Sequence, residues 1–227
     1  MTRPSTPPLD SMPFNRQWRL QCQRWAEAAG SDGAHNLAHI QRVVVTAQRL
    51  GQQAGAELAV ILPAAWLHDV VLIDKRDPRR SQASLLAADK AVSLLTEHGY
   101  PRQYLDAIHH AIAAHSWSAG IEPTTLEAQI VQDADRLDAL GAIGLARCLM
   151  LGGEFGNQLY HSEDPLASSR PLDDGQYCLD HFFTKLRHLP GQLRTEAGRQ
   201  EGAKRWALMQ TFIDRLQQEI AQPGETS

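Results

Sequence analysis

Apolar residues recur at helical spacing along most of the chain. Within residues 36–54, Leu37, Ile40, Val44 and Ala47 follow one another at intervals of three or four residues, which places them on one face of a helix. No stretch of useful length shows the strict alternation that is typical of a strand. The pattern therefore predicts an all-α protein. The helices are expected at residues 14–30, 36–54, 57–71, 81–98, 101–115, 125–139, 141–151, 174–189 and 195–221.

The helical region is flanked by two segments that lack this pattern. Residues 1–13 are rich in Pro, Ser and Thr, and we expect them and residues 222–227 to be flexible tails. A chain of 227 residues is long enough to bury a core, and we expect residues 14–221 to form a single-domain helical bundle. Pro63 either kinks the third helix or marks its start.

The composition narrows the classes of function. A net charge of −4 and a pI near 6.2 disfavour a dedicated nucleic-acid binder. The longest apolar runs fall short of the ~20 residues that a membrane helix needs, and no secretory signal is visible. Cys22, Cys148 and Cys178 are too scattered for a disulfide framework or a thiolate zinc site. We therefore expect a cytoplasmic protein with neither a nucleic-acid nor a membrane partner; the oligomeric state stays open.

Four ionisable residues lie in apolar helical surroundings. They are His39, His68, Asp69 and Asp135, and buried charge is unfavourable unless it is paired or bound to a metal. Taken singly, each histidine is more often a hydrogen-bonded core residue than a ligand. Taken together, two imidazoles and two carboxylates form a ligand set without a thiolate, which suits Mn²⁺, Mg²⁺, Fe²⁺, Co²⁺ or Zn²⁺. Such a set leaves about two positions of an octahedral ion for water and a substrate oxygen.

The order of these residues resembles a known family. The segments HNLAHIQRV, AAWLHD and QDADRLDALGAIGLAR follow the H…HD…D order of the HD-domain superfamily of metal-dependent phosphohydrolases. Together with HFFTKLRHLPGQLRTEAGRQEGAKRWALM, they are similar to a cytosolic bacterial subfamily over nearly the whole domain. The resemblance implies an all-helical fold of the HD type and one divalent ion bound by His39, His68, Asp69 and Asp135. In one departure, Asn36 stands where the subfamily usually has Asp.

Asp138 is a candidate for a supporting or catalytic role. It follows Asp135 by three residues, so both lie on one face of a helix. We expect it to orient a metal ligand or to take the proton of the attacking water. The structural alternative is an ion pair with Arg42 or Arg136.

Two further histidines are candidates for the neighbourhood of the ion. His35 precedes His39 by one turn, and it either orients a ligand or is an ordinary residue of the turn. His115 shares a helix face with Ile108 and Ile112, so we expect it to point inward and to contact the substrate.

Cations that can bind a phosphate lie close to the metal motif in sequence. Lys75 and Arg80 belong to the loop after the HD pair, and Arg42 follows His39 by three residues. We expect these three, together with the hydroxyl of Ser84, to contact the substrate. The alternative for the loop is a solvated segment whose charges are balanced by neighbouring aspartates.

These observations favour a divalent-metal-dependent phosphohydrolase that acts on a nucleotide, with His68, Asp69 and Asp138 at the reacting centre. Two alternatives remain. The extra histidines of HHAIAAHS, residues 109–116, are also compatible with a di-iron oxygenase of the HD type. A non-catalytic nucleotide sensor is the other, although all four expected ligands are present.

Overall fold

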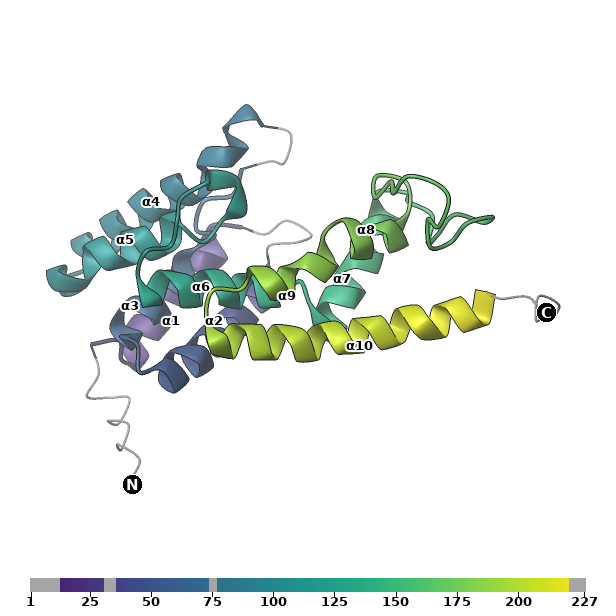
Figure 1. Ribbon diagram of the computed structural model, residues 1–227. Helices are drawn as coiled ribbons and strands as arrows, with labels where there is room; N and C mark the ends of the chain where they lie inside the picture. The colour runs from purple at the N-terminus through teal and green to yellow at the C-terminus, as the bar shows by residue number, and fades with distance from the viewer. Residues whose placement is uncertain (1–12, 31–35, 74–76, 221–227) are drawn as a thin grey trace, which may run out of the picture. The chain divides into compact units, whose positions relative to one another are not determined.

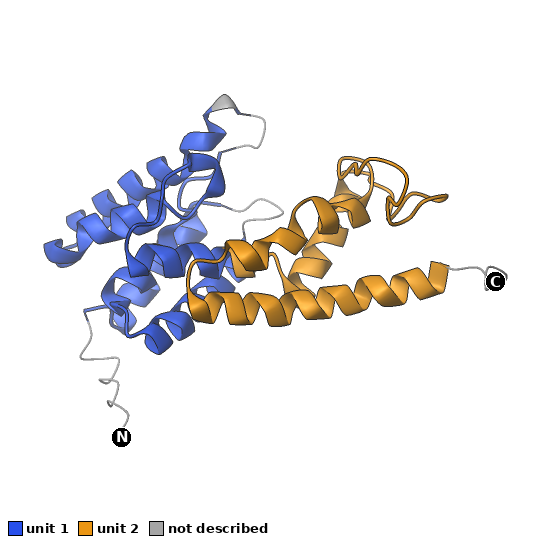
Figure 2. Ribbon diagram, viewed as in Figure 1, with its two compact units in different colours: residues 1–135 blue, residues 136–227 orange. Residues whose placement is uncertain are grey.

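The computed structural model describes residues 13–30, 36–73 and 77–220, with the Pro78 side chain left aside. Over these residues the regular structure is helical, with one isolated bridge between Gln158 and Tyr177, so the all-α prediction is confirmed. The chain divides into two compact units, Met1–Asp135 and Arg136–Ser227, each described here by itself (Figure 2). The expectation of a single domain over residues 14–221 stays a prediction. No helix among the described residues is both long and apolar enough to cross a membrane.

The first unit is built around one buried helix, α3 (Figure 1). All ten residues of α3 are buried, and α1, α2, α4 and α5 pack against it. The remaining bounds are α1 Arg16–Ala28, α2 Leu37–Ala54, α3 Leu58–Leu67, η2 Pro78–Gln82, α4 Ala83–Glu97, η3 Arg102–Tyr104, α5 Leu105–Ala113 and η4 Trp117–Ala119. The helix α6, Leu126–Leu137, carries the chain into the second unit.

Pro63 lies inside α3 and does not start the helix. A proline has no N–H, so it leaves the carbonyl four residues earlier, that of Ala59, without its helical donor. The Tyr100 hydroxyl donates a hydrogen bond of 2.6 Å to this carbonyl, and Tyr100 is itself buried. The fold thus replaces the missing backbone donor with a side chain from the segment between α4 and η3.

The start of α2 is fixed by Asn36, the residue that departs from the family pattern. Its side-chain oxygen accepts a hydrogen bond of 3.0 Å from the backbone N–H of His39, which is the usual bond of a helix N-cap. An aspartate would cap the helix in the same way. The departure therefore leaves the position of the His39 backbone intact.

The second unit contains α7 Gly141–Glu154, α8 Cys178–Thr184, η5 Leu186–His188, α9 Leu189–Gln192 and α10 Glu196–Ile220. α10 packs against α7 and α9 and buries Met209 and Ile213. The single helix expected over residues 174–189 is wrong: α8 begins at Cys178, and Lys185 leaves helical geometry with φ −129° and ψ −57°. Short helical turns follow it.

Candidate metal centre

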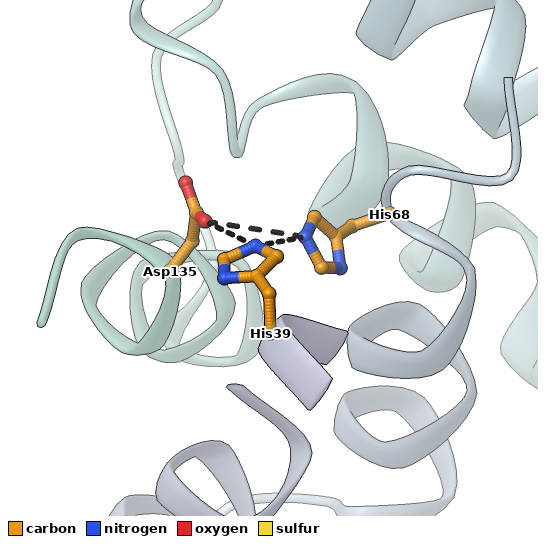
Figure 3. A group of neighbouring side chains, drawn as sticks. All are labelled: His39, His68 and Asp135. Carbon is orange, nitrogen blue, oxygen red and sulfur yellow. Dashed lines mark hydrogen bonds and ion pairs between the residues drawn. The ribbon is translucent and has the colours of Figure 1, made fainter. Parts of the chain in front are cut away.

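The four residues of the H…HD…D pattern come together in the first unit. His39 lies in the first turn of α2, His68 caps the C-terminus of α3, Asp69 follows it, and Asp135 lies on α6. Figure 3 shows the side chains of His39, His68 and Asp135 pointing toward one another from three helical segments. His39 and His68 are buried, whereas the Asp135 side chain is 30% exposed. The cluster is therefore open to solvent on the side of Asp135.

The ligand atoms of the four residues are spaced as donors around one ion are. Nε2 of His68 lies 3.4 Å from Nε2 of His39 and 3.3 Å from Oδ2 of Asp69. Oδ1 of Asp135 lies 3.3 Å from the His39 nitrogen and 3.9 Å from that of His68. Ligands at about 2.1 Å from an ion are separated by about 3.0 Å at adjacent octahedral positions and by about 3.4 Å at tetrahedral ones. The residues present therefore fit a divalent ion.

The orientation of the His68 ring is set by the helix that carries it. Its Nδ1–H donates a hydrogen bond of 2.8 Å to the carbonyl of Ala65, in the last turn of α3. A carbonyl only accepts, so the other ring nitrogen, Nε2, is the atom turned toward the carboxylates. Metal-binding histidines are commonly held in this way.

The electrostatics of the cluster favour a positive charge at its centre. Burial alone would lower the pKa of His68, but Asp69 and Asp135 raise it to about 9. Burial would conversely raise the pKa of Asp135, and a hydrogen bond from His39 with the charges of the histidines instead holds that pKa below its usual range. The carboxylates of Asp69 and Asp135 thus stabilise a positive charge between them, which is either a protonated imidazole or a bound cation.

His115 lies beside this cluster. It is buried at the end of α5, with Nε2 3.8 Å from Oδ1 of Asp69 and its ring centroid 5.0 Å from that of His68. Burial and the neighbouring His68 lower its pKa. His68, Asp69 and His115 form a second group with metal-binding spacing, which shares His68 with the first group, so the two groups adjoin.

The structure shows the surroundings of three of the residues that were expected to contact the substrate. Ser84 is buried, and its hydroxyl donates to the carbonyl of Ala113. Arg80 is half-buried and donates to the carbonyl of Ile73, whereas Arg42 is half-buried on α2. His35 and Lys75 lie outside the described residues.

Asp138 belongs to the second unit, where its carboxylate accepts a hydrogen bond of 2.5 Å from Arg147 on α7. Arg147 is a partner that the sequence did not indicate beside Arg42 and Arg136. The ion pair spans the turn between α6 and α7, which spacing along one helix does not reveal.

Comparisons with known proteins agree with this geometry. Residues 36–140, which include all four expected ligands, match the family model of the HD domain. The uncharacterized protein YpgQ of Bacillus subtilis is 30% identical over 210 residues, which are 90% of this chain and 93% of YpgQ. The chain belongs to the HD-domain family. Membership of this family supports a metal-dependent hydrolase.

Solved structures extend the likeness to the whole fold. The crystal structure of B. subtilis YpgQ in complex with ADP matches this HD-domain protein with a TM-score of 0.70 and 31% identity, over 91% of this chain and 98% of YpgQ. An HD-superfamily hydrolase from Bacillus thuringiensis matches with a TM-score of 0.71 and 30% identity, over 90% and 97% of the two chains.

Proposed function

We propose that this HD-domain protein hydrolyses a phosphate ester or anhydride of a nucleotide, with one divalent ion held by His39, His68, Asp69 and Asp135. The observation that carries the proposal is the convergence of these four side chains at metal-binding distances. The nucleotide is supported by the relative YpgQ, which was crystallised with ADP.

The donor set limits the choice of ion. Two imidazole nitrogens and two carboxylate oxygens suit Mn²⁺, Mg²⁺, Co²⁺, Fe²⁺ or Zn²⁺. A divalent ion bound there would lower the pKa of a water and polarise a phosphoryl oxygen. Because Asp135 is the ligand most exposed to solvent, we infer that a phosphate approaches past this residue.

The chain supplies further groups for the reaction. His68 and Asp69 hold the reacting centre together, and Arg42, Arg80 and Lys75 are the proposed cations that neutralise the remaining phosphate oxygens. The role of Asp138 as acceptor of the water proton stays a prediction from the sequence, because this residue belongs to the second unit, where its carboxylate accepts a hydrogen bond from Arg147.

A substrate screen tests the proposal. Purified protein is incubated with nucleoside mono-, di- and triphosphates in the presence of each divalent ion in turn, and phosphate and pyrophosphate are measured separately. We expect hydrolysis by the wild type and loss of hydrolysis in His68→Ala, whereas His109→Ala, which changes a partly exposed histidine paired with Asp89, retains it.

Two results would contradict the proposal, and they come from measurements made beside the screen: oxygen uptake with metal analysis, and nucleotide binding. Oxygen consumption with two irons per chain would indicate an oxygenase. Nucleotide binding without hydrolysis under every ion would indicate a sensor.

A further inference from the structure

The C-terminus of α5 is held by side chains from three different segments. The last carbonyls of a helix have no partner within it and need donors from elsewhere. The Ile112 carbonyl accepts a hydrogen bond of 2.6 Å from Nδ1–H of His115, and the Ala113 carbonyl accepts one of 2.9 Å from the Ser84 hydroxyl. The Ala114 carbonyl accepts one of 2.7 Å from the Gln132 amide.

We propose that Ser84 and Gln132 are positioning residues of the metal centre, which act by holding His115 against Asp69. This inference rests on the proposed metal centre, and it gives Ser84 a role other than the substrate contact expected from the sequence. Both residues are 2% exposed, so their side-chain hydrogen bonds are made inside the protein and not with solvent.

The placement of Gln132 links His115 to one of the expected ligands. Gln132 precedes Asp135 by three residues on α6, so the two lie on one face of that helix. Its amide holds the carbonyl of Ala114, the residue next to His115. Ser84 ties the same turn to the start of α4. Hydrogen bonds from α4 and from α6 thus both restrain the C-terminus of α5.

The ring of His115 gains a defined orientation from this arrangement. Because the Ile112 carbonyl only accepts, Nδ1 carries the hydrogen and Nε2 presents a lone pair. That lone pair faces Oδ1 of Asp69 at 3.8 Å. Two acceptor atoms that face each other attract a cation or a donor hydrogen between them. His115 therefore helps Asp69 to stabilise a positive charge at this place.

A double-mutant cycle on metal affinity tests the proposal. Binding of Mn²⁺ is measured by electron paramagnetic resonance for wild type, Ser84→Ala, Gln132→Met and His115→Gln, and for Ser84→Ala combined with His115→Gln. Changing a partner of a metal ligand weakens affinity by about 10- to 100-fold, and we expect such a loss for His115→Gln. Ser84→Ala and Gln132→Met should each lose about three- to tenfold, below that range. Ser84→Ala should cause no further loss once His115 is replaced.

Matched controls lie on the same helices. Ser93→Ala on α4 removes a hydroxyl that donates to Glu97 at the surface, and Gln129→Leu on α6 removes an amide that donates to the Pro123 carbonyl. Both should leave Mn²⁺ affinity at the wild-type value. Thermal unfolding of every variant is recorded, so that loss of fold is recognised separately from loss of positioning.

A second readout requires no metal. In the metal-free protein, ¹⁵N spectra of the imidazole rings should show His115 with its hydrogen on Nδ1, and Ser84→Ala and Gln132→Met should perturb this signal. Folded variants with unchanged Mn²⁺ affinity and an unchanged His115 signal would overturn the positioning role, as would additive losses in the cycle. A wild type that binds no Mn²⁺ but shows the expected ring signals would overturn the metal centre instead.

Discussion

At the scale of single residues, the His68–Asp69 pair explains why two polar residues end an apolar helix. Nδ1 of His68 satisfies the Ala65 carbonyl of its own helix, and Nε2 meets the Asp69 carboxylate at 3.3 Å. Neither polar group is therefore buried without a partner, which would be strongly unfavourable. The apolar helix serves as a rigid support for both side chains.

The raised pKa of His68 predicts that metal binding depends on pH. Below its pKa of about 9, the metal-free protein holds a proton on His68 that an ion must displace. The apparent affinity should therefore rise with pH by up to about tenfold per unit and level off near pH 9, because one proton is released for each ion bound. Titration with Mn²⁺ between pH 7 and pH 9 measures this slope. An affinity that does not change over this range would contradict the protonation of His68.

At the scale of the helices, side-chain hydrogen bonds to backbone groups hold the elements in place. Asn36, which departs from the family pattern, caps α2 and fixes the backbone of His39. Tyr100 completes the hydrogen bonding of α3 where Pro63 interrupts it. The role of Tyr100 depends on which carbonyl lies nearby in space, 41 residues away along the chain, and spacing along the chain does not contain this information.

Removing the Asn36 side chain that caps α2 should lower the free energy of unfolding. Asn36→Ala deletes the acceptor of the His39 N–H, a change that typically costs about 1 kcal/mol. This corresponds to a fall of about 2–4 °C in the unfolding midpoint for a chain of this size. Asn36→Asp retains an acceptor and should unfold near the wild-type temperature. Equal midpoints for the wild type and Asn36→Ala in a thermal scan would argue against the cap.

Removing the Tyr100 hydroxyl should destabilise the first unit. In Tyr100→Phe, the Ala59 carbonyl is left buried without a donor, which costs about 1–3 kcal/mol. Tyr104→Phe, a change at a half-buried tyrosine of the neighbouring η3 turn, is the control and should have a smaller effect. Urea unfolding of both variants measures the difference. If Tyr100→Phe were as stable as Tyr104→Phe, the Tyr100 hydroxyl would not stabilise the helix in place of the N–H that Pro63 lacks.

At the scale of the whole molecule, the sequence predicted the fold class and most helices, because amphipathic periodicity is a local property. The four expected ligands also come together, since the family pattern marks them residue by residue. Partners on another element were not predicted: the Ser84 hydroxyl donates to a carbonyl 29 residues later, and Asp138 accepts from Arg147 across the turn between α6 and α7. The helix expected over residues 174–189 failed because a local break at Lys185 leaves the apolar pattern intact.

The single-domain expectation for residues 14–221 predicts one cooperative unfolding transition. Arg170 donates two hydrogen bonds to the fully buried Asp180 in the second unit. Arg170→Ala should lower the midpoint, because it leaves that carboxylate without its charged partner. Arg187→Ala, at an exposed residue of η5, is the control. If the chain is a single domain, calorimetry of Arg170→Ala should show one unfolding transition with a lowered midpoint. Two transitions, of which only one has a lowered midpoint, would indicate two independently folding units.

The proposed function requires that one ion is bound by His39, His68, Asp69 and Asp135. Crystals grown with Mn²⁺ and ADP, with anomalous scattering measured at the manganese edge, test it most directly. We expect one strong peak at about 2.0–2.3 Å from Nε2 of both histidines and from an oxygen of each aspartate. A manganese peak elsewhere, or one at this place that lacks His39 or Asp135 as a ligand, would contradict it.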